Sequence, residues 1–349
     1  MLSATPSAAH ADTDAPPPLT DGNGLTQVPT ERAIADNNTG TAFVITVTTP
    51  QVANDPGTTG HHIKILLPAD YAANPTKRYP VLYLLHGVGG NPIEASSYAA
   101  LQNPTSMIEV IPDGGTRGWY TNWLYQTTAA GAQNWENFHI NQVIPFIDAN
   151  LRTIPDRAHR AIAGISMGGF GAFHYAQNHP GLFSQTASLS GAIDLSRDAM
   201  DVRMAAVGTL TNVGGVCGSS SPVCQLSFGP TVSSDALFGT PYLFSIYYPY
   251  SDTLWNSADP STHMAKMAGM GISIYVGNGN GDPSSMEFWA ESASKHVKDH
   301  LDALKMPYHY VDYGNGAGWG SCDGGHDGLC WAQDLQDWIP RLEQAFAAA

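Results

Sequence analysis

Short apolar runs alternate with helical patterns along most of this sequence. Four continuous runs are typical of strands buried on both faces of a sheet: residues 81–85, 107–111, 161–163 and 272–276. Helical patterns lie between and after them, at about residues 135–150, 167–178, 284–305 and 331–347. Strands that alternate with helices predict an α/β fold, in which a mostly parallel sheet carries helices on both faces.

The start of the chain has a different composition. Residues 4–18 are rich in Ala, Pro, Ser, Thr and Asp and show no apolar periodicity. Within them, Ala9-His10-Ala11 resembles the small-x-small cleavage site of a secretory signal peptide. We therefore expect residues 1–40 to be a signal-peptide remnant and a disordered leader.

The remainder, residues 41–349, is expected to form one domain. Residues 43–48 and 62–67 alternate in polarity and predict antiparallel or edge strands at its beginning. Residues 208–252 are its least regular stretch and are predicted to form an insertion or lid.

Net charge and hydropathy exclude two classes of protein. The chain has 15 Lys+Arg against 30 Asp+Glu, a formal net charge of −15, whereas nucleic-acid binding needs clustered cations. There is no Lys or Arg between Met204 and Ala265, so the average hides no basic stripe there. No apolar run approaches the roughly 20 residues that cross a bilayer. We expect neither nucleic-acid binding nor a membrane span.

The four cysteines form two pairs that are close in sequence, Cys217 with Cys224 and Cys322 with Cys330. Neither pair has C-x-x-C spacing or a His-rich zinc pattern, so no metal site is expected. Four cysteines allow three connectivities, and we favour the two local disulfides. Disulfides suit an oxidising compartment, which predicts a protein that is secreted, extracellular or associated with a cell wall.

Residues 161–169 contain the pattern G-x-S-x-G, with Ser166 at its centre. A predicted strand precedes the pattern and a predicted helix follows it, which is the context of a nucleophile elbow. Gly164 and Gly168 permit a turn too tight for side chains. Ser166 would project from that turn at the helix N-terminus, where the helix dipole favours developing negative charge. We expect Ser166 to be a nucleophile.

A serine hydroxyl is a weak nucleophile and needs a base that a third group orients. In elbow-containing chains the base is a histidine that follows the acid in sequence. His326 meets this condition, because it lies in the loop 322–330 between the predicted last strand, 308–313, and the last helix. A disulfide between Cys322 and Cys330 would hold that loop in place.

The acid should follow the strand at residues 272–276. Asp282 and Glu287 compete for this role, and Glu291 is a weaker third candidate. Whichever of them does not orient the imidazole is expected to cap the next helix.

Two backbone N–H groups should stabilise the oxyanion that forms when a serine attacks a carbonyl. One is expected from Met167, the residue after the nucleophile. The other is expected from Val88, in the glycine-rich loop at residues 84–90 that follows a buried strand. This chemistry needs no metal and no organic cofactor, so none is predicted.

These motifs resemble the putative-esterase family of the α/β-hydrolases, from about Val81 to the C-terminus. That family includes acetyl and feruloyl esterases, S-formylglutathione hydrolases and the secreted mycolyltransferases of mycolic-acid-walled bacteria. Besides 84–90 and 164–169, the resemblance rests on Asp113-Gly-Gly, Trp119-Tyr-Thr-Asn-Trp123, Tyr275-Val-Gly-Asn-Gly279, and Gly325-His326 with Trp331. It implies an α/β-hydrolase fold and a bacterial protein.

The resemblance bears on the acid and on the substrate. Esterases of the family point to Asp282, and mycolyltransferases point to a Glu at the head of the next helix. We favour Glu287 slightly. Where mycolyltransferases carry an Asp and an Arg that engage the sugar acceptor, this chain has His86 and Gly89-Gly90, as in hydrolases. Gly328 replaces a mycolyltransferase tryptophan, so acyl transfer to water is the simpler expectation.

Three side chains are candidate substrate-binding residues: His86, Tyr120 and Trp123. For the two aromatic residues the alternative is a place in the core.

The sequence thus predicts a secreted serine esterase that cleaves small-molecule or polymer-linked carboxylic esters through an acyl-enzyme. One alternative is an acyltransferase, similar to the mycolyltransferases, that moves an acyl group to a sugar or lipid hydroxyl. A second is a cell-wall-associated binding protein on a hydrolase scaffold, because folds are reused for unrelated functions. The oligomeric state is left open.

Overall fold

The computed structural model of the chain describes residues 15–31, 34–35, 40–54, 57–102, 106–211, 230–239 and 248–349. Within these residues, ten strands form one sheet in the order β1-β3-β4-β6-β5-β7-β8-β9-β10, with β2 paired to β3. The strands are β1 (Thr26–Gln27), β2 (Ile34–Ala35), β3 (Ala42–Thr48), β4 (His61–Leu66), β5 (Val81–Leu85), β6 (Ile108–Pro112), β7 (Arg160–Ile165), β8 (Gln185–Leu189), β9 (Gly271–Gly277) and β10 (His309–Gly314).

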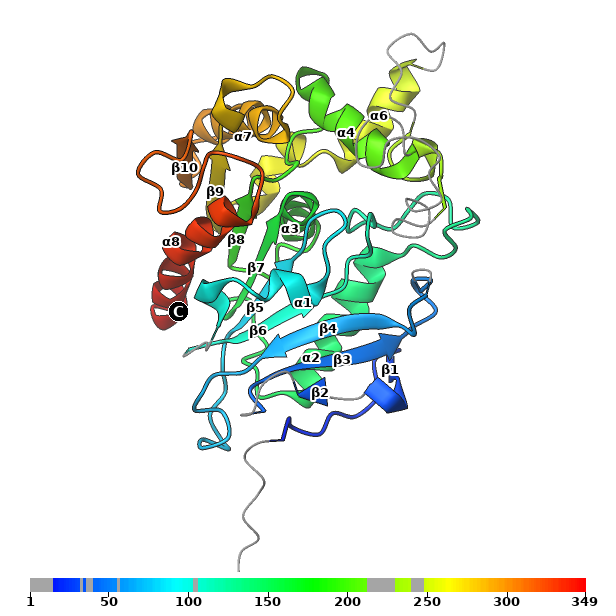
Figure 1. Cartoon of the computed structure of the whole chain (residues 1–349), viewed down its shortest axis with the longest axis vertical. Helices are drawn as coiled ribbons and strands as arrows, with labels where there is room; N and C mark the ends of the chain where they lie inside the picture. Colours follow the sequence, from blue (N-terminus) through cyan, green and yellow to red (C-terminus); the bar gives the residue numbers. More distant parts are fainter. Residues whose placement is uncertain are drawn as a thin grey trace, which may run out of the picture.

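The sheet has an antiparallel part and a parallel part. The pairs from β1 through β3 and β4 to β6 are antiparallel, and those from β6 through β5, β7, β8 and β9 to β10 are parallel. The antiparallel strands β3 and β4 and the last strands β9 and β10 lie at opposite ends of the molecule (Figure 1). The predicted parallel α/β sheet is confirmed.

The described helices cover both faces of this sheet. They are α1 (Pro92–Ala95), α2 (Ile144–Asn150), α3 (Met167–Asn178), α4 (Met200–Thr211), α6 (Tyr248–Ala258), α7 (Met286–Ala303) and α8 (Gly328–Ala347). A π-helical segment, Asn137–Val143, leads into α2. Short 3-10 segments occur at Pro29–Glu31, Ala99–Leu101, Arg197–Ala199, Ser234–Ala236, Pro260–Met267 and Gly279–Gly281.

Alternation along β5 shows how the two faces are filled. Val81, Tyr83 and Leu85 belong to the apolar cluster that contains residues of α2, α3 and α7. Leu82 and Leu84 belong to the cluster that contains residues of α1 and α8. Because successive strand side chains point to opposite faces, the continuous apolar run of β5 is a consequence of burial on both sides.

The predicted leader extends too far along the chain. Leu19 and Leu25 are 5% and 2% exposed, and β1 and β2 pair with β3. Two isolated leucines and two-residue strands leave no periodic signal, so composition alone assigned this segment to the leader. Residues 1–14, which include the predicted cleavage site, lie outside the described residues.

The predicted insertion at residues 208–252 is described only in part, because 212–229 and 240–247 lie outside the described ranges. Cys217 and Cys224, and the disulfide predicted between them, fall in the first of these gaps. In the described part, Phe238 stacks on Trp255 with ring centroids 4.7 Å apart, and both side chains are buried. This part of the segment therefore belongs to the hydrophobic core.

None of the helices in the described ranges is both long and apolar enough to cross a membrane.

A buried carboxyl group ties the loop after β8 to the 3-10 segment at Pro260. Asp259 is fully buried. It accepts hydrogen bonds from the Leu195 N–H (2.8 Å), the Ser261 N–H (3.0 Å) and the Ser261 hydroxyl (2.7 Å). Burial, with the nearby carboxyl group of Asp194, raises the pKa of Asp259 to about 6.

Because the native pKa of Asp259 exceeds its ordinary value of 3.8, ionisation costs the native state stability as the pH rises from about 4 to above 6. An Asn side chain keeps the three hydrogen bonds, because its oxygen accepts from the two N–H groups and its amide donates to the Ser261 hydroxyl. We predict that Asp259→Asn is about 2–3 kcal/mol more stable than wild type at pH 8 and equal to it near pH 4. Urea unfolding at both pH values measures this, and an equal difference at both would contradict it.

Candidate active site

Ser166 is the single residue of a sharp turn between β7 and α3. Its φ is 56° and its ψ is −115°, a backbone conformation that is strained for any residue with a Cβ. The turn is held by the Ser166 N–H, which donates to the Leu189 carbonyl (2.9 Å), and by the N–H groups of Gly169 and Phe170, which donate to the Ser166 carbonyl (2.9 and 3.2 Å). The surrounding backbone therefore imposes the strain, as the predicted elbow requires.

The glycines on either side of Ser166 are required by close backbone contacts. A Cβ on Gly168 would lie 2.1 Å from the Leu85 carbonyl oxygen, and one on Gly164 would lie 1.9 Å from the Gly168 carbonyl oxygen. Both contacts are with backbone atoms, which cannot move aside cheaply. The elbow therefore packs directly against the end of β5.

Three of the predicted site residues form one chain of hydrogen bonds. His326 Nε2 lies 2.9 Å from Ser166 Oγ, and His326 Nδ1 lies 2.7 Å from Glu287 Oε2. Ser166 and His326 are partly exposed, whereas Glu287 is fully buried. In this arrangement Nδ1–H donates to the carboxylate and Nε2 is free to accept the serine proton.

Buried groups fix the second oxygen of Glu287. Oε1 accepts from the Gly277 N–H (2.6 Å), the Ser190 hydroxyl (2.9 Å) and the Tyr313 hydroxyl (3.2 Å). Burial, together with the carboxyl groups of Asp334 and Glu287, raises the pKa of Tyr313, so this phenol stays protonated and donates. The carboxyl group is thus held at both oxygens.

Asp282, the other candidate acid, does not reach the imidazole. Its side chain is exposed and accepts from the Ser284 N–H (2.9 Å) and the Ser284 hydroxyl (2.8 Å). These hydrogen bonds lower the pKa of Asp282. It closes a turn ahead of α7, but the N-cap of α7 is Ser285, so the prediction that the unused acid caps this helix is wrong. Glu291 forms an ion pair with Lys295 instead (2.7 Å).

The loop that carries Val88 runs beside Ser166. A Cβ on Gly87 would lie 3.4 Å from Ser166 Cβ and 4.0 Å from Ser166 Oγ. Neither the Val88 N–H nor the Met167 N–H is hydrogen bonded to any part of the chain that the structure describes. Both predicted donors therefore sit on segments adjacent to Ser166 and have no competing acceptor there.

Residues 58–342 match the protein family described as Putative esterase. The chain belongs to this esterase family. An esterase from Mycobacterium tuberculosis is 43% identical over 140 residues, which cover 39% of this chain and 30% of that protein. The chain therefore spans less than a third of that relative. The diacylglycerol acyltransferase/mycolyltransferase Ag85B from Mycobacterium avium is 25% identical over 252 residues, covering 69% of this chain and 66% of the relative.

Solved structures identify the fold of this esterase-family chain. The crystal structure of MPT51 from Mycobacterium tuberculosis matches with a TM-score of 0.58 at 20% identity, over 84% of this chain and 97% of that one. The fluorophosphonate-binding serine hydrolase FphF from Staphylococcus aureus matches with a TM-score of 0.58 at 17% identity, over 86% and 98% of the two chains. The predicted α/β-hydrolase fold is confirmed.

The prediction that His86, Tyr120 and Trp123 contact the substrate is wrong. His86, Tyr120 and Trp123 are 1%, 0% and 3% exposed, so they belong to the core of the esterase-family chain and line no open surface. The Tyr120 hydroxyl donates to the His86 carbonyl (2.9 Å), and the Trp123 indole donates to the Gly118 carbonyl (3.0 Å).

The His86 ring has a supporting role next to Val88. His86 Nε2 accepts from the Gly114 N–H (2.9 Å), so Nδ1 carries the proton and donates to the Gly87 carbonyl (2.9 Å). This imidazole thereby links the loop after β5 to the loop after β6.

A disulfide joins the loop of His326 to α8. Cys322 and Cys330 are bonded across a sequence separation of 8 residues, as predicted, and Cys330 lies in the first turn of α8. The N-cap of that helix is Asp327, which accepts from the Leu329 N–H (2.8 Å). The histidine is thus flanked by a cross-link and a helix cap.

Within the described ranges, one group of side chains has the spacing of metal ligands: Asp323, Asp327 and Cys330. The Cys330 sulfur is engaged in the disulfide, which leaves two carboxylates, each occupied in a local turn or cap. This group does not make a metal site.

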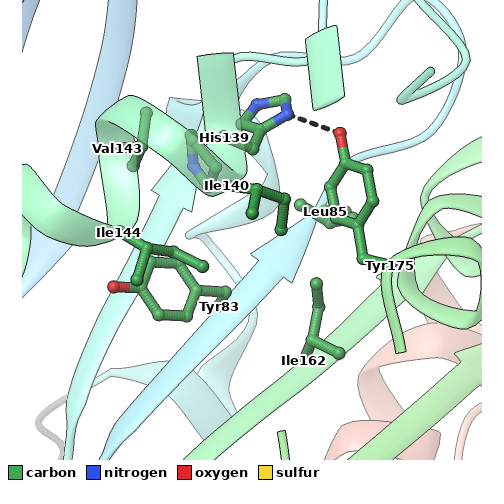
Figure 2. Close-up of a pocket in the computed structure, with 9 residues that line it drawn as sticks. Tyr83, Leu85, His139, Ile140, Val143, Ile144, Ile162 and Tyr175 are labelled. Atoms are coloured by element: carbon green, nitrogen blue, oxygen red, sulfur yellow. Dashed lines mark hydrogen bonds between the residues drawn. The ribbon is translucent and has the colours of Figure 1, made fainter. Parts of the chain in front are cut away.

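A small cavity lies on the side of the sheet that α2 and α3 cover, between β5, β7 and the π-helical segment (Figure 2). Its volume is about 10 Å³, enough for one water molecule at most. His139 and Tyr175 lie at its edge with His139 Nδ1 2.8 Å from the Tyr175 hydroxyl, and burial lowers the pKa of His139 to about 4. The cavity is a packing feature and not a substrate pocket.

Sequence reasoning missed the residues that hold Glu287. Ser190 follows β8, whose sequence Gln-Thr-Ala-Ser-Leu lacks the branched apolar run that marks the other central strands. Tyr313 was placed on the last strand without a role. The one available signal was Trp331, which belongs to the motif around His326 and donates its indole N–H to Ser190 Oγ (3.0 Å).

Proposed function

We propose that this chain is a serine esterase that hydrolyses carboxylic esters, with Ser166 as nucleophile, His326 as general base and acid, and Glu287 as the acid that orients the imidazole. The observation that carries the proposal is the continuous hydrogen-bonded series from buried Glu287 through His326 to Ser166. Membership of the esterase family supports the reaction class.

The reaction follows from this geometry. Ser166 Oγ attacks the ester carbonyl carbon, and its proton passes to His326 Nε2. The N–H groups of Val88 and Met167 stabilise the oxyanion. The C–O bond to the alcohol breaks, and the alcohol leaves with the proton from Nε2. Water then attacks the acyl carbon, and His326 Nε2 takes its proton. The bond to Ser166 Oγ breaks, Oγ receives the proton back from Nε2, and the free acid leaves. Throughout, Glu287 orients the imidazole and stabilises the imidazolium that forms.

The acceptor of the acyl group and the location of the protein are two further proposals. The acyltransferase name of the Ag85B relative makes transfer to a hydroxyl the second candidate function, through the same acyl-enzyme. We propose water as acceptor because His86 and Gly89-Gly90 stand where a sugar-engaging Asp and Arg would be expected. The disulfide at Cys322 supports a secreted or wall-associated protein.

We also propose that the substrates are uncharged near the ester. The loops after β5, β7, β9 and β10 contain no Lys or Arg, and Arg197, in the stretch after β8, forms an ion pair with Asp252. In the loop after β6, the buried Arg117 guanidinium donates to the carbonyls of Thr209 and Leu210 (3.0 and 3.1 Å). Exposed Asp282 and Asp323 lie on neighbouring loops, which the Asn280 amide joins by donating to the Asp323 carbonyl (3.0 Å). An anionic substrate would meet no counter-charge here.

One prediction of the proposed function concerns the triad, with 4-nitrophenyl butyrate as substrate. Ser166→Ala should lower kcat by about 10⁴-fold or more, and Glu287→Gln by about 10³–10⁴-fold, because the imidazole loses its orienting charge. Asp282→Asn is the matched control and should keep activity within about 2-fold. Loss of activity in Asp282→Asn with retention in Glu287→Gln would overturn the acid assignment.

The same assay distinguishes ester hydrolysis from acyl transfer and from a binding function. With added glycerol, hydrolysis predicts the free acid as the main product, and an acylated glycerol as the main product would favour the acyltransferase. A wild-type protein as inert as Ser166→Ala towards a series of esters would favour the binding-protein alternative.

Another prediction of the proposed function concerns charge selectivity. The esterase should cleave 4-carbamoylphenyl butyrate at least about 5-fold faster in kcat/KM than 4-carboxyphenyl butyrate, after correction for their alkaline hydrolysis rates, because the carboxylate is repelled. The double variant Asp282→Asn/Asp323→Asn removes the two exposed carboxylates and should bring the two kcat/KM values closer together. Equal rates, or a preference for the anionic ester, would contradict the proposal.

A further inference from the structure

We propose that Trp331 is a positioning residue that acts through Ser190 to fix the carboxyl group of Glu287 against His326. This inference rests on the proposed function, in which Glu287 and His326 belong to the triad. It assigns a task to a tryptophan in the motif around His326 that the reaction itself does not use.

Ser190 is rigidly placed between the tryptophan and the carboxylate. Its φ is 50°, a left-handed conformation that is uncommon for a residue with a Cβ. Its N–H donates to the Tyr275 carbonyl (2.8 Å), and its side chain is 2% exposed. The backbone therefore presents the hydroxyl to a dry site with few alternative partners.

The direction of the Ser190 hydroxyl depends on Trp331. A hydroxyl has one hydrogen to donate and two lone pairs to accept. The Trp331 indole N–H donates to Ser190 Oγ (3.0 Å), and an indole N–H can only donate. The hydroxyl hydrogen therefore points away from the indole, and the nearer of its two remaining acceptors is Glu287 Oε1, 2.9 Å away. Without the indole, the hydroxyl would be free to turn towards the Tyr313 hydroxyl, 3.4 Å away.

Trp331 also contacts the base. Its ring lies edge-to-face against the His326 imidazole, with centroids 5.2 Å apart and planes at 89°. Trp331 thus packs on the His326 imidazole. Through Ser190 it also orients a hydrogen bond to Glu287, the carboxylate that contacts this imidazole. The Trp331 backbone N–H donates to the Asp327 carbonyl (3.2 Å), so the first turn of α8 holds the tryptophan in this place.

The predicted effect is on the reactivity of the His326–Glu287 pair and not on substrate affinity. A carboxylate that loses a hydrogen-bond donor becomes more basic, and so does the imidazole that it contacts. Ser190→Ala should therefore raise the pKa on the acidic limb of the kcat/KM profile. Trp331→Phe keeps an aromatic ring against His326 but removes the N–H, and it should shift the limb in the same direction.

A double-mutant cycle tests the dependence on Ser190. We expect Trp331→Phe to lower kcat about 10-fold in the wild-type background, with KM unchanged, and to have almost no effect in the Ser190→Ala background, since contacting groups in one network are not additive. Equal losses in both backgrounds, or an unmoved acidic limb in both single variants, would overturn the proposal. Trp289→Phe is the matched control, because its indole N–H donates to the Pro283 carbonyl (2.7 Å) away from the pair.

An NMR titration of His326 keeps this test independent of turnover. If wild type titrates at His326 and Ser190→Ala raises its pKa, Trp331 and Ser190 position the pair even in a protein that hydrolyses no ester tested. In that case the proposed function fails while the positioning network stands. An unchanged His326 pKa in Ser190→Ala, in a protein that does hydrolyse esters, would remove the network and leave the proposed function intact.

Discussion

The site depends on the close backbone contact between the turn at Ser166 and the end of β5. A Cβ at Gly168 would collide with the Leu85 carbonyl oxygen, so the turn and the strand approach as closely as two backbones can. In this turn Ser166 has a φ of 56° and a ψ of −115°, and its hydroxyl lies at the carboxyl edge of the sheet. The contact also sets the loop after β5, with Val88, directly beside Ser166. Strain of this kind persists only where the surrounding structure imposes it.

The other members of the site reach Ser166 from distant parts of the chain. His326 comes from the loop after β10, and Glu287 comes from the first turn of α7, which follows β9. These two strands are parallel neighbours in the sheet. Because parallel strands end at one edge, their following loops meet. Glu287 is then fixed by donors from β9, from β10 and from the residue after β8. The proposed base and its carboxylate are therefore positioned by the sheet rather than by the loops alone.

The sequence predicted the strands and helices whose burial leaves a periodic pattern. The helix expected at residues 167–178 is α3, and the apolar run at 81–85 is β5. The sequence pattern did not predict β8. The glycines and small side chains around Gly169 and Gly191 let α3 and this strand pack closely without large apolar residues. The helix predicted from Trp331 begins earlier, at Gly328, because Asp327 caps it.

The candidate site was predictable to the same extent. Ser166 and His326 follow from a local motif and from chain order, and the structure brings them together. The choice between Asp282 and Glu287 was close in sequence, since both precede or begin the same helix. In the structure their burial and their contacts separate them, because Glu287 is buried and hydrogen bonded to His326. His86 and Tyr120 were assigned to substrate because buried polar residues that support a loop carry the same sequence signal as residues that bind a ligand.

The most direct test of the central claim is to find which atom the enzyme uses to attack an ester-like electrophile. A fluorophosphonate probe should modify wild type once, and peptide mass mapping should locate the modification at Ser166, while Ser166→Ala should remain unmodified. Stoichiometric modification of a different residue, or ester hydrolysis that continues after Ser166 is fully modified, would contradict the account.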